Sequence, residues 1–82
     1  MAGEKTFGRR FKVCRVIAGY DTLGEASKAT GLSKGSLSDY ENDKRLPLLP
    51  AIAAMADAYD VSVDFLLGRT DTTEHDGRTI SI

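Results

Sequence analysis

The chain has 82 residues, of which 41% are hydrophobic, so it suits one small domain and leaves no room for a second core. No apolar run approaches the roughly 20 residues of a membrane span, and no signal peptide is recognisable, which predicts a cytoplasmic protein without a membrane partner. Residues 1–45 hold nine basic against six acidic side chains, a balance of +3, whereas residues 46–82 hold two against six, a balance of −4. This asymmetry predicts a basic end that faces phosphate groups and an acidic end that faces away.

The first predicted element is an amphipathic helix over about residues 5–18. Its apolar stripe, broadened by Val13, Val16 and Ile17, consists of Phe7, Phe11, Cys14 and Ala18. The basic residues expected outside it are Arg9, Arg10, Lys12 and Arg15. Cys14 is the only cysteine, so it forms no internal disulfide, and its place in the stripe predicts core packing.

The second predicted helix covers residues 23–30, with Thr22 as its N-cap. The spacing i, i+3, i+4, i+7 predicts that Leu23, Ala26, Ser27 and Thr30 face inward. Two of these are small, so the helix can cross closely over the next one.

A third helix over residues 34–42 follows Gly31, which ends the second helix, and Ser33, which stands at an N-cap. Leu37, Tyr40 and Glu41 recur at the spacing of one face. The opposite face is polar and consists of Lys34, Gly35, Ser38, Asp39 and Asn42. A major groove about 12 Å wide admits such a helix. From spacing alone, DNA contact and an ordinary solvated face are almost equally favoured.

Two further helices are predicted over residues 49–59, framed by Pro47 and Pro50, and 62–67, capped by Ser62. The inner face of the first, with Met55 beside it, consists of Leu49, Ile52, Ala53, Ala56 and Tyr59. For the second we expect Val61, Val63 and Leu66 to close the core. Phe65 and Leu67 are then left outside, and exposed apolar neighbours predict a dimer or partner interface.

The remaining tail, residues 69–82, is polar and ends in an alternating Thr-Ile-Ser-Ile run. Disorder, a short paired strand that could form a dimer, and a connection to a further domain all fit this pattern. The only histidine, His75, has no companion for a metal site or a catalytic triad. The sequence therefore predicts no enzyme activity, no cofactor and no metal.

The ordered motifs from Ala26 to Leu67 resemble the lambda repressor/Cro-like (XRE-type) helix-turn-helix family of phage repressors, Cro proteins and bacterial regulators. The matching residues are Ala26-Ser27-Lys28-Ala29-Thr30-Gly31-Leu32-Ser33, Leu37-Ser38, Tyr40-Glu41-Asn42, Lys44-Arg45, Pro47 and Val61-Ser62-Val63-Asp64-Phe65-Leu66-Leu67. The resemblance implies an all-α, compact five-helix DNA-binding domain over residues 1–68.

The resemblance places four base-reading positions on the third helix, at Lys34, Gly35, Ser38 and Asp39. Lys34 can donate to guanine O6 and N7, and Ser38 can contact either kind of base pair. Gly35 offers no side chain but allows close approach of the backbone. Asp39 either accepts from cytosine N4 or orients a Lys or Arg such as Lys34, and the pattern favours neither.

Contacts to the DNA backbone are implied at Asn42, Lys44 and Arg45, which follow the third helix. The family often has Gln at the start of helix two, where this chain has Leu23, so Thr22 or a backbone amide is the expected replacement. Asp43 replaces the usual Gly.

The resemblance also pairs Arg15 with Glu41 in a partly buried, structural ion pair. Loss of one partner of a buried pair costs on the order of 3–5 kcal/mol.

These observations predict a sequence-specific transcriptional regulator, of the phage or prophage repressor type, that binds double-stranded operator DNA. A homodimer would place two recognition helices about 34 Å apart on an inverted repeat, and an antirepressor is a further expected partner. Two alternatives are an antitoxin of a toxin–antitoxin pair and a protein-interaction module with reduced DNA binding. Gly35, Leu23 and the acidic balance favour the last of these.

Overall fold

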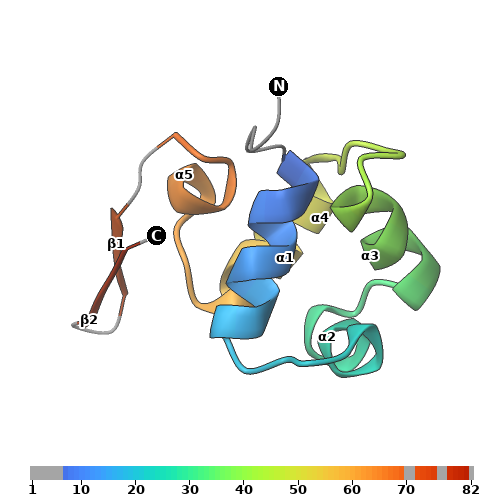
Figure 1. Cartoon of the computed structure of the whole chain (residues 1–82), viewed down its shortest axis with the longest axis horizontal. Helices are drawn as coiled ribbons and strands as arrows, with labels where there is room; N and C mark the ends of the chain where they lie inside the picture. Colours follow the sequence, from blue (N-terminus) through green and yellow to red (C-terminus); the bar gives the residue numbers. More distant parts are fainter. Residues whose placement is uncertain (1–6, 70–71, 76–77, 82) are drawn as a thin grey trace.

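The computed structural model describes residues 7–69, 72–75 and 78–81. In this part of the chain five helices precede a β-hairpin (Figure 1). The helices are α1 (Phe7–Ile17), α2 (Leu23–Thr30), α3 (Lys34–Glu41), α4 (Leu49–Tyr59) and α5 (Val63–Leu66). The helical body confirms the predicted all-α, five-helix class.

Local hydrogen bonds set the helix boundaries where the sequence predicts them. Thr22 and Glu25 form a capping box, in which Glu25 N donates to Thr22 Oγ1 at 3.1 Å and Thr22 N donates to Glu25 Oε1 at 3.0 Å. Ser33 accepts from Ser36 N, and Ser62 accepts from Phe65 N, each at 3.1 Å. These side chains satisfy amides that lack a partner within the helix, so α2, α3 and α5 start where expected.

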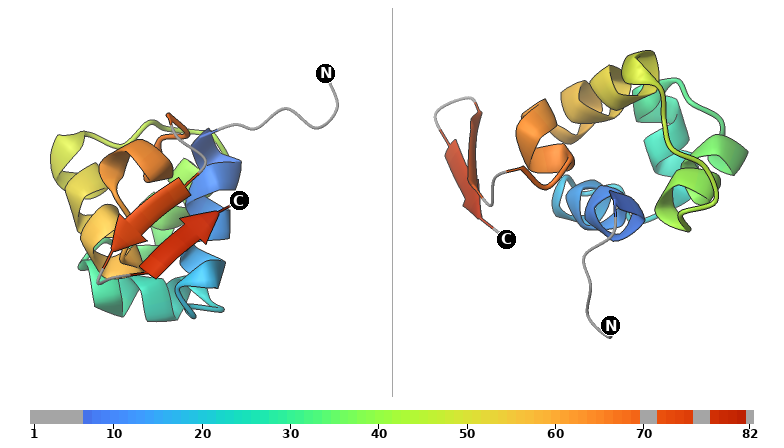
Figure 2. Two further views of the ribbon diagram at one scale, coloured as in Figure 1. Left: turned by 90° about the vertical axis from the view of Figure 1, so that its left-hand side faces the viewer. Right: turned by 90° about the horizontal axis from the view of Figure 1, so that it is seen from above.

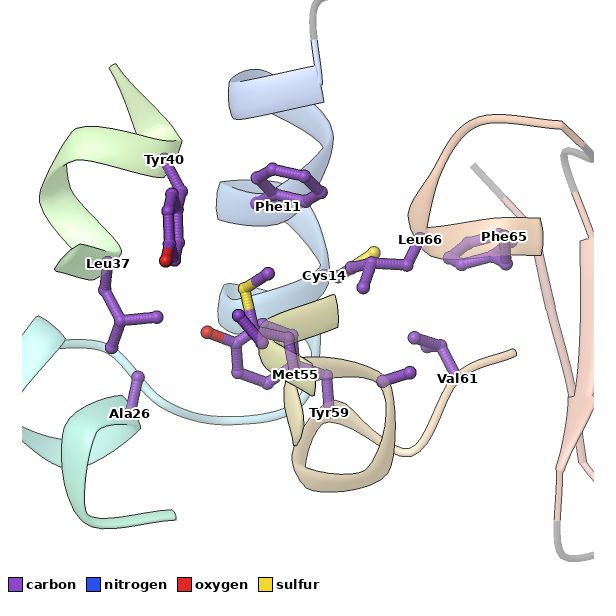
Figure 3. Packing of buried hydrophobic residues seen from close by; sticks show 12 residues of the cluster. Phe11, Cys14, Ala26, Leu37, Tyr40, Met55, Tyr59, Val61, Phe65 and Leu66 are labelled. Atoms are coloured by element: carbon purple, nitrogen blue, oxygen red, sulfur yellow. The ribbon is translucent and has the colours of Figure 1, made fainter. Parts of the chain in front are cut away.

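The core lies where α1 packs against α3, α4 and α5, while α2 packs on α3 and α4 (Figures 1 and 2). Figure 3 shows its larger members, among them Phe11, Leu37, Tyr59 and Phe65. Burial raises the pKa of the Cys14 thiol to about 11, so the thiol stays protonated at neutral pH and acts as a small apolar side chain. This agrees with the packing role predicted for Cys14.

The predicted faces of α1 and α4 are partly wrong. On α1, Arg10 is buried, whereas Phe7, Val16 and Ile17 are half exposed. The burial of Arg15 agrees with the expected ion pair to Glu41. On α4, Leu49 and Ala53 are exposed, and the buried residues are Ala51, Met55, Ala56 and Tyr59. An alanine-rich helix presents apolar atoms on every side, so hydropathy alone does not identify its inner face.

The prediction for α5 is wrong at Phe65, which is completely buried and cannot form a dimer interface. Arg10 covers it, because the guanidinium carbon lies 4.7 Å from the ring centroid and Arg10 Nε donates to Phe65 O at 2.7 Å. Val63, expected in the core, is exposed instead, and Leu67 is only partly buried. A helix of one turn is too short for a periodic stripe to identify its inner side.

The tail forms an antiparallel hairpin of β1 (Thr72–His75) and β2 (Arg78–Ser81), with Thr72 opposite Ser81 and His75 opposite Arg78. The hairpin lies beyond α5 (Figures 1 and 2). Pairing as a short strand is thus the alternative that these eight residues adopt. The predicted start of α1 at residue 5, and residues 70–71, 76–77 and 82 of the tail, lie outside the described residues.

Candidate nucleic-acid interface

The turn between α2 and α3 is held by short-range hydrogen bonds. Gly31 takes a left-handed conformation, with φ of 78°, that ends α2. Ser27 Oγ then donates to Leu32 O at 2.6 Å, and Leu32 N donates to Thr30 Oγ1 at 3.1 Å. With Ala26 and Leu37 buried together between the helices (Figure 3), the two helices form one rigid unit.

The α3 reading face, defined here as Lys34, Gly35, Ser38 and Asp39, lies on the outer side of this unit. Lys34 and Gly35 are exposed, and Ser38 and Asp39 are partly exposed, while Leu37 and Tyr40 point into the core. Helix α3 lies at the margin of the molecule in Figure 1. All four positions therefore face solvent at least in part.

Asp39 pairs with Arg45 rather than with Lys34, the partner that the sequence interpretation gave as an example. Arg45 Nε lies 3.2 Å from Asp39 Oδ2, and Arg45 Nη2 donates to Ser36 Oγ at 2.8 Å. The guanidinium also lies over the Tyr40 ring, 5.3 Å from its centroid. An exposed pair of this kind contributes at most about 1 kcal/mol, so its main effect is to position Arg45 beside α3.

Asn42 and Lys44 are both exposed after the end of α3. The Asn42 amide folds back and donates to Ser38 O at 2.8 Å and to Ser38 Oγ at 3.2 Å. Asn42 therefore closes the C-terminal turn of α3 and orients the Ser38 hydroxyl. Thr22, the remaining phosphate candidate, is exposed, but its hydroxyl already belongs to the capping box.

Arg15 and Glu41 form a two-pronged ion pair between α1 and α3. Arg15 Nε donates to Glu41 Oε2 at 2.8 Å, and Arg15 Nη2 donates to Glu41 Oε1 at 3.2 Å. Both side chains are less than a tenth exposed, and Arg15 Nη1 also donates to Tyr20 O at 2.7 Å. The hydrogen bond to Glu41 raises the pKa of Arg15. The pair fixes the orientation of α3 on the core.

Sequence reasoning missed a second link between these helices, at Gly8 and Asp43. Gly8 N donates to Asp43 Oδ1 at 2.9 Å, so Asp43 caps an amide in the first turn of α1. Asp43 has a φ of 60°, which agrees with the left-handed conformation that Asp tolerates. A Cβ atom on Gly8 would lie 2.5 Å from Glu41 O and 2.7 Å from Tyr40 O, so only glycine fits this contact. No local sequence signal marks either role.

A hollow of about 510 Å³ opens between α1 and α3 beside the reading face. Its lining includes Arg9 and Lys12, two basic residues that were expected outside the apolar stripe but were not among the predicted DNA-backbone contacts, and also Leu23 at the start of α2. Arg9 and Lys12 are spaced i, i+3 on the exposed side of α1, and this spacing is the sequence signal that could have identified them as a pair. Exposed cations beside an open polar hollow suit a phosphate group.

The described residues contain no cluster of three or more His, Cys, Asp and Glu side chains that could hold a metal ion. Within the same part of the chain, every helix is too short or too polar to cross a membrane.

Comparison with known proteins places the same segments in a recognised family. A family model described as helix-turn-helix matches residues 15–66, which run from the end of α1 through α5. The chain is 35% identical over 69 residues to the HTH-type transcriptional regulator ImmR of Bacillus subtilis (strain 168), covering 84% of this chain and 54% of that protein. It is 35% identical over 72 residues to the HTH-type transcriptional regulator SinR of Bacillus licheniformis, covering 87% and 64%. The chain thus spans between half and two thirds of the length of these relatives.

Proposed function

We propose that this chain, which belongs to the lambda repressor/Cro-like (XRE-type) helix-turn-helix family of transcriptional regulators, is a cytoplasmic repressor that binds an inverted-repeat operator as a dimer. A phage or prophage origin of its operator, and an antirepressor as a regulatory partner, belong to the same proposal. Repression follows when the bound protein occupies promoter DNA.

The observation that carries the proposal is the open α3 reading face beside basic residues. Lys34 stands in the first turn of α3, where its ammonium can reach guanine O6 and N7 in the major groove. Ser38 lies one turn later and supplies a hydroxyl to a neighbouring base edge. Two side chains can contact only a few base edges, so contacts to the DNA backbone must contribute much of the affinity.

Backbone contacts are assigned to basic groups on α1 and after α3. Arg9 and Lys12 line the hollow next to the reading face, and Lys44 and Arg45 follow α3 along the chain. Asp39 holds Arg45 in place until a phosphate competes for it, so Asp39 acts here as a positioning residue. The acidic residues Asp57 and Asp64 lie on α4 and α5 rather than on α3, which reduces their repulsion of DNA.

The proposal is tested by selecting fragments from a random-sequence DNA pool with the purified chain. We expect enrichment of an inverted repeat and an affinity that falls steeply as salt rises, because bound phosphates release counterions. Failure to retain any DNA between low and physiological salt would contradict the proposal and would favour the protein-interaction module.

Gly35 provides a test in which stability and binding move in opposite directions. A Cβ atom at Gly35 meets nothing within 4 Å, so Gly35→Ala fits the fold. Alanine is favoured over glycine by about 0.5–1 kcal/mol in a helix interior, and Gly35 lies in the first turn of α3, so the variant should be more stable by up to that amount in urea unfolding. We expect its affinity for the selected DNA to fall, because the added methyl group separates α3 from the bases. Unchanged affinity would show that the backbone does not approach DNA at this position.

A further inference from the structure

Apolar side chains stand exposed on the outer side of α1. Val16 is 47% exposed and Ile17 is 49% exposed, and Val13 beside them is partly exposed. Together with Arg9 and Lys12 they line a hollow of about 430 Å³, and we call these five residues the α1 outer face. Helix α1 lies along one edge of the helical body in the right-hand view of Figure 2. Exposed apolar groups that gather on a small domain indicate an interface.

The α1 outer face follows the spacing of a helix surface. Taking Arg9 as position i, Lys12 and Val13 stand at i+3 and i+4, and Val16 and Ile17 stand at i+7 and i+8. At a rise of 1.5 Å per residue, the face runs for about 12 Å along α1, or roughly two turns. The two cations lie toward its N-terminal end and the apolar side chains toward its C-terminal end. A second helix laid along α1 would therefore meet positive charge at one end and apolar surface at the other.

Phosphate groups do not explain the apolar end of this face. Val16 and Ile17 have no polar side-chain atoms, and they lie in the last turn of α1, where the helix dipole is negative. DNA can thus gain from Arg9 and Lys12 but not from these two residues. An occupant of the whole face needs anionic groups at one end and apolar groups at the other.

Arg9 and Lys12 border two hollows at once. They line the hollow between α1 and α3 that is assigned to the DNA backbone, and they also line the hollow on the α1 outer face. A cation that pairs with a carboxylate of a partner no longer neutralises a phosphate. An occupant of the α1 outer face would therefore compete with DNA for both side chains.

We propose that the α1 outer face binds an amphipathic helix of a regulatory protein, an inference that rests on the proposed DNA-binding function. The apolar residues of this partner helix cover Val13, Val16 and Ile17, and its carboxylates pair with Arg9 and Lys12. Five side chains on two turns form a small contact, in the range of transient interfaces that bury less than about 1,200 Å² in total. The partner releases the protein from its operator, because the partner and DNA use the same cations.

The test begins with a library of helical peptides in which apolar residues are fixed at i, i+3, i+4 and i+7 and the other positions vary. The purified chain should enrich peptides that carry Asp or Glu toward one end of the apolar stripe. We expect a saturating amount of such a peptide to lower the affinity for the selected inverted repeat about tenfold or more, and DNA to weaken peptide binding by the same factor.

Ile17→Ser separates the two ligands. Ile17 is half exposed, so the variant should fold, which circular dichroism checks. It should bind the peptide about fivefold more weakly or worse, because it loses apolar contact area, and should bind DNA like wild type. Val63→Ser is the matched control, because Val63 is a 41% exposed apolar residue of α5, and it should leave both affinities unchanged. Lys12→Ala should weaken both.

Equal peptide affinity of wild type and Ile17→Ser would overturn the proposal, since the peptide would then lie elsewhere. A library that yields no acidic peptide, or a peptide that binds without displacing DNA, would overturn it too. If wild type binds no DNA but its peptide binding still depends on Ile17, the proposed function fails while the partner surface stands, so the two failures are distinguishable.

Discussion

Glu41→Ala should unfold a large part of the protein population, because it leaves the Arg15 guanidinium buried without its carboxylate partner. Removing one member of a buried pair costs roughly 3–5 kcal/mol. A single core of this size supplies only about 3–5 kcal/mol of stability, so the loss is comparable to the whole. Arg15 keeps its hydrogen bond to Tyr20 O, which does not neutralise its charge. The measurement is urea unfolding followed by circular dichroism.

Asp39→Ala is the matched control for this prediction, since it removes a carboxylate from the same helix but breaks an exposed pair. Its side chain and that of Arg45 are 38% and 53% exposed, so the expected loss is below about 1 kcal/mol. Equal unfolding midpoints for Glu41→Ala and Asp39→Ala would contradict the structural role assigned to the Arg15–Glu41 pair.

Phe65→Ala should destabilise the protein to a similar extent, because it removes a fully buried ring of α5, the helix that packs against α1. Phenylalanine to alanine in a core costs about 3–5 kcal/mol, and the variant also loses the contact of Arg10 with the ring. Leu67→Ala, at a partly buried neighbour, should cost clearly less. Thermal unfolding measures both.

This comparison also separates two roles for Phe65. A core residue lowers the melting temperature at every protein concentration, whereas an interface residue lowers self-association and leaves the stability of the monomer unchanged. A Phe65→Ala protein with the wild-type melting temperature and weaker self-association would restore the interface prediction and contradict the core role described here.

Features of the fold set by neighbours along the chain could be predicted from the sequence. Thr22, Ser33 and Ser62 cap helices because the amides they satisfy lie three residues away. Gly31 ends α2 for an equally local reason. The order of these signals also identified the helix-turn-helix, while the assignment of base-reading residues on α3 stays a prediction.

Contacts between segments that are distant in the sequence could not be predicted from local patterns. Arg10 shields Phe65 from 55 positions away, which buries a ring that the pattern placed outside. Gly8 and Asp43 meet across 35 positions, and their contact depends on how closely α1 approaches α3. The exposure of Leu49 likewise depends on how α4 is rotated against the core. Each outcome is set by tertiary packing, which has no signature in local periodicity.

Whether the outer face of α3 reads DNA is tested most directly by the affinity of Lys34→Ala for two DNA fragments at one fixed salt concentration. One fragment is the selected operator and the other is a scrambled sequence. Loss of a specific base contact is worth about 1–3 kcal/mol, so operator affinity should fall roughly 5- to 150-fold while scrambled DNA is bound almost as before. Lys28→Ala, which removes an exposed lysine of α2 outside the reading face, should bind like wild type. A Lys34→Ala protein that still distinguishes the operator as well as wild type does would contradict the claim that the outer face of α3 reads DNA.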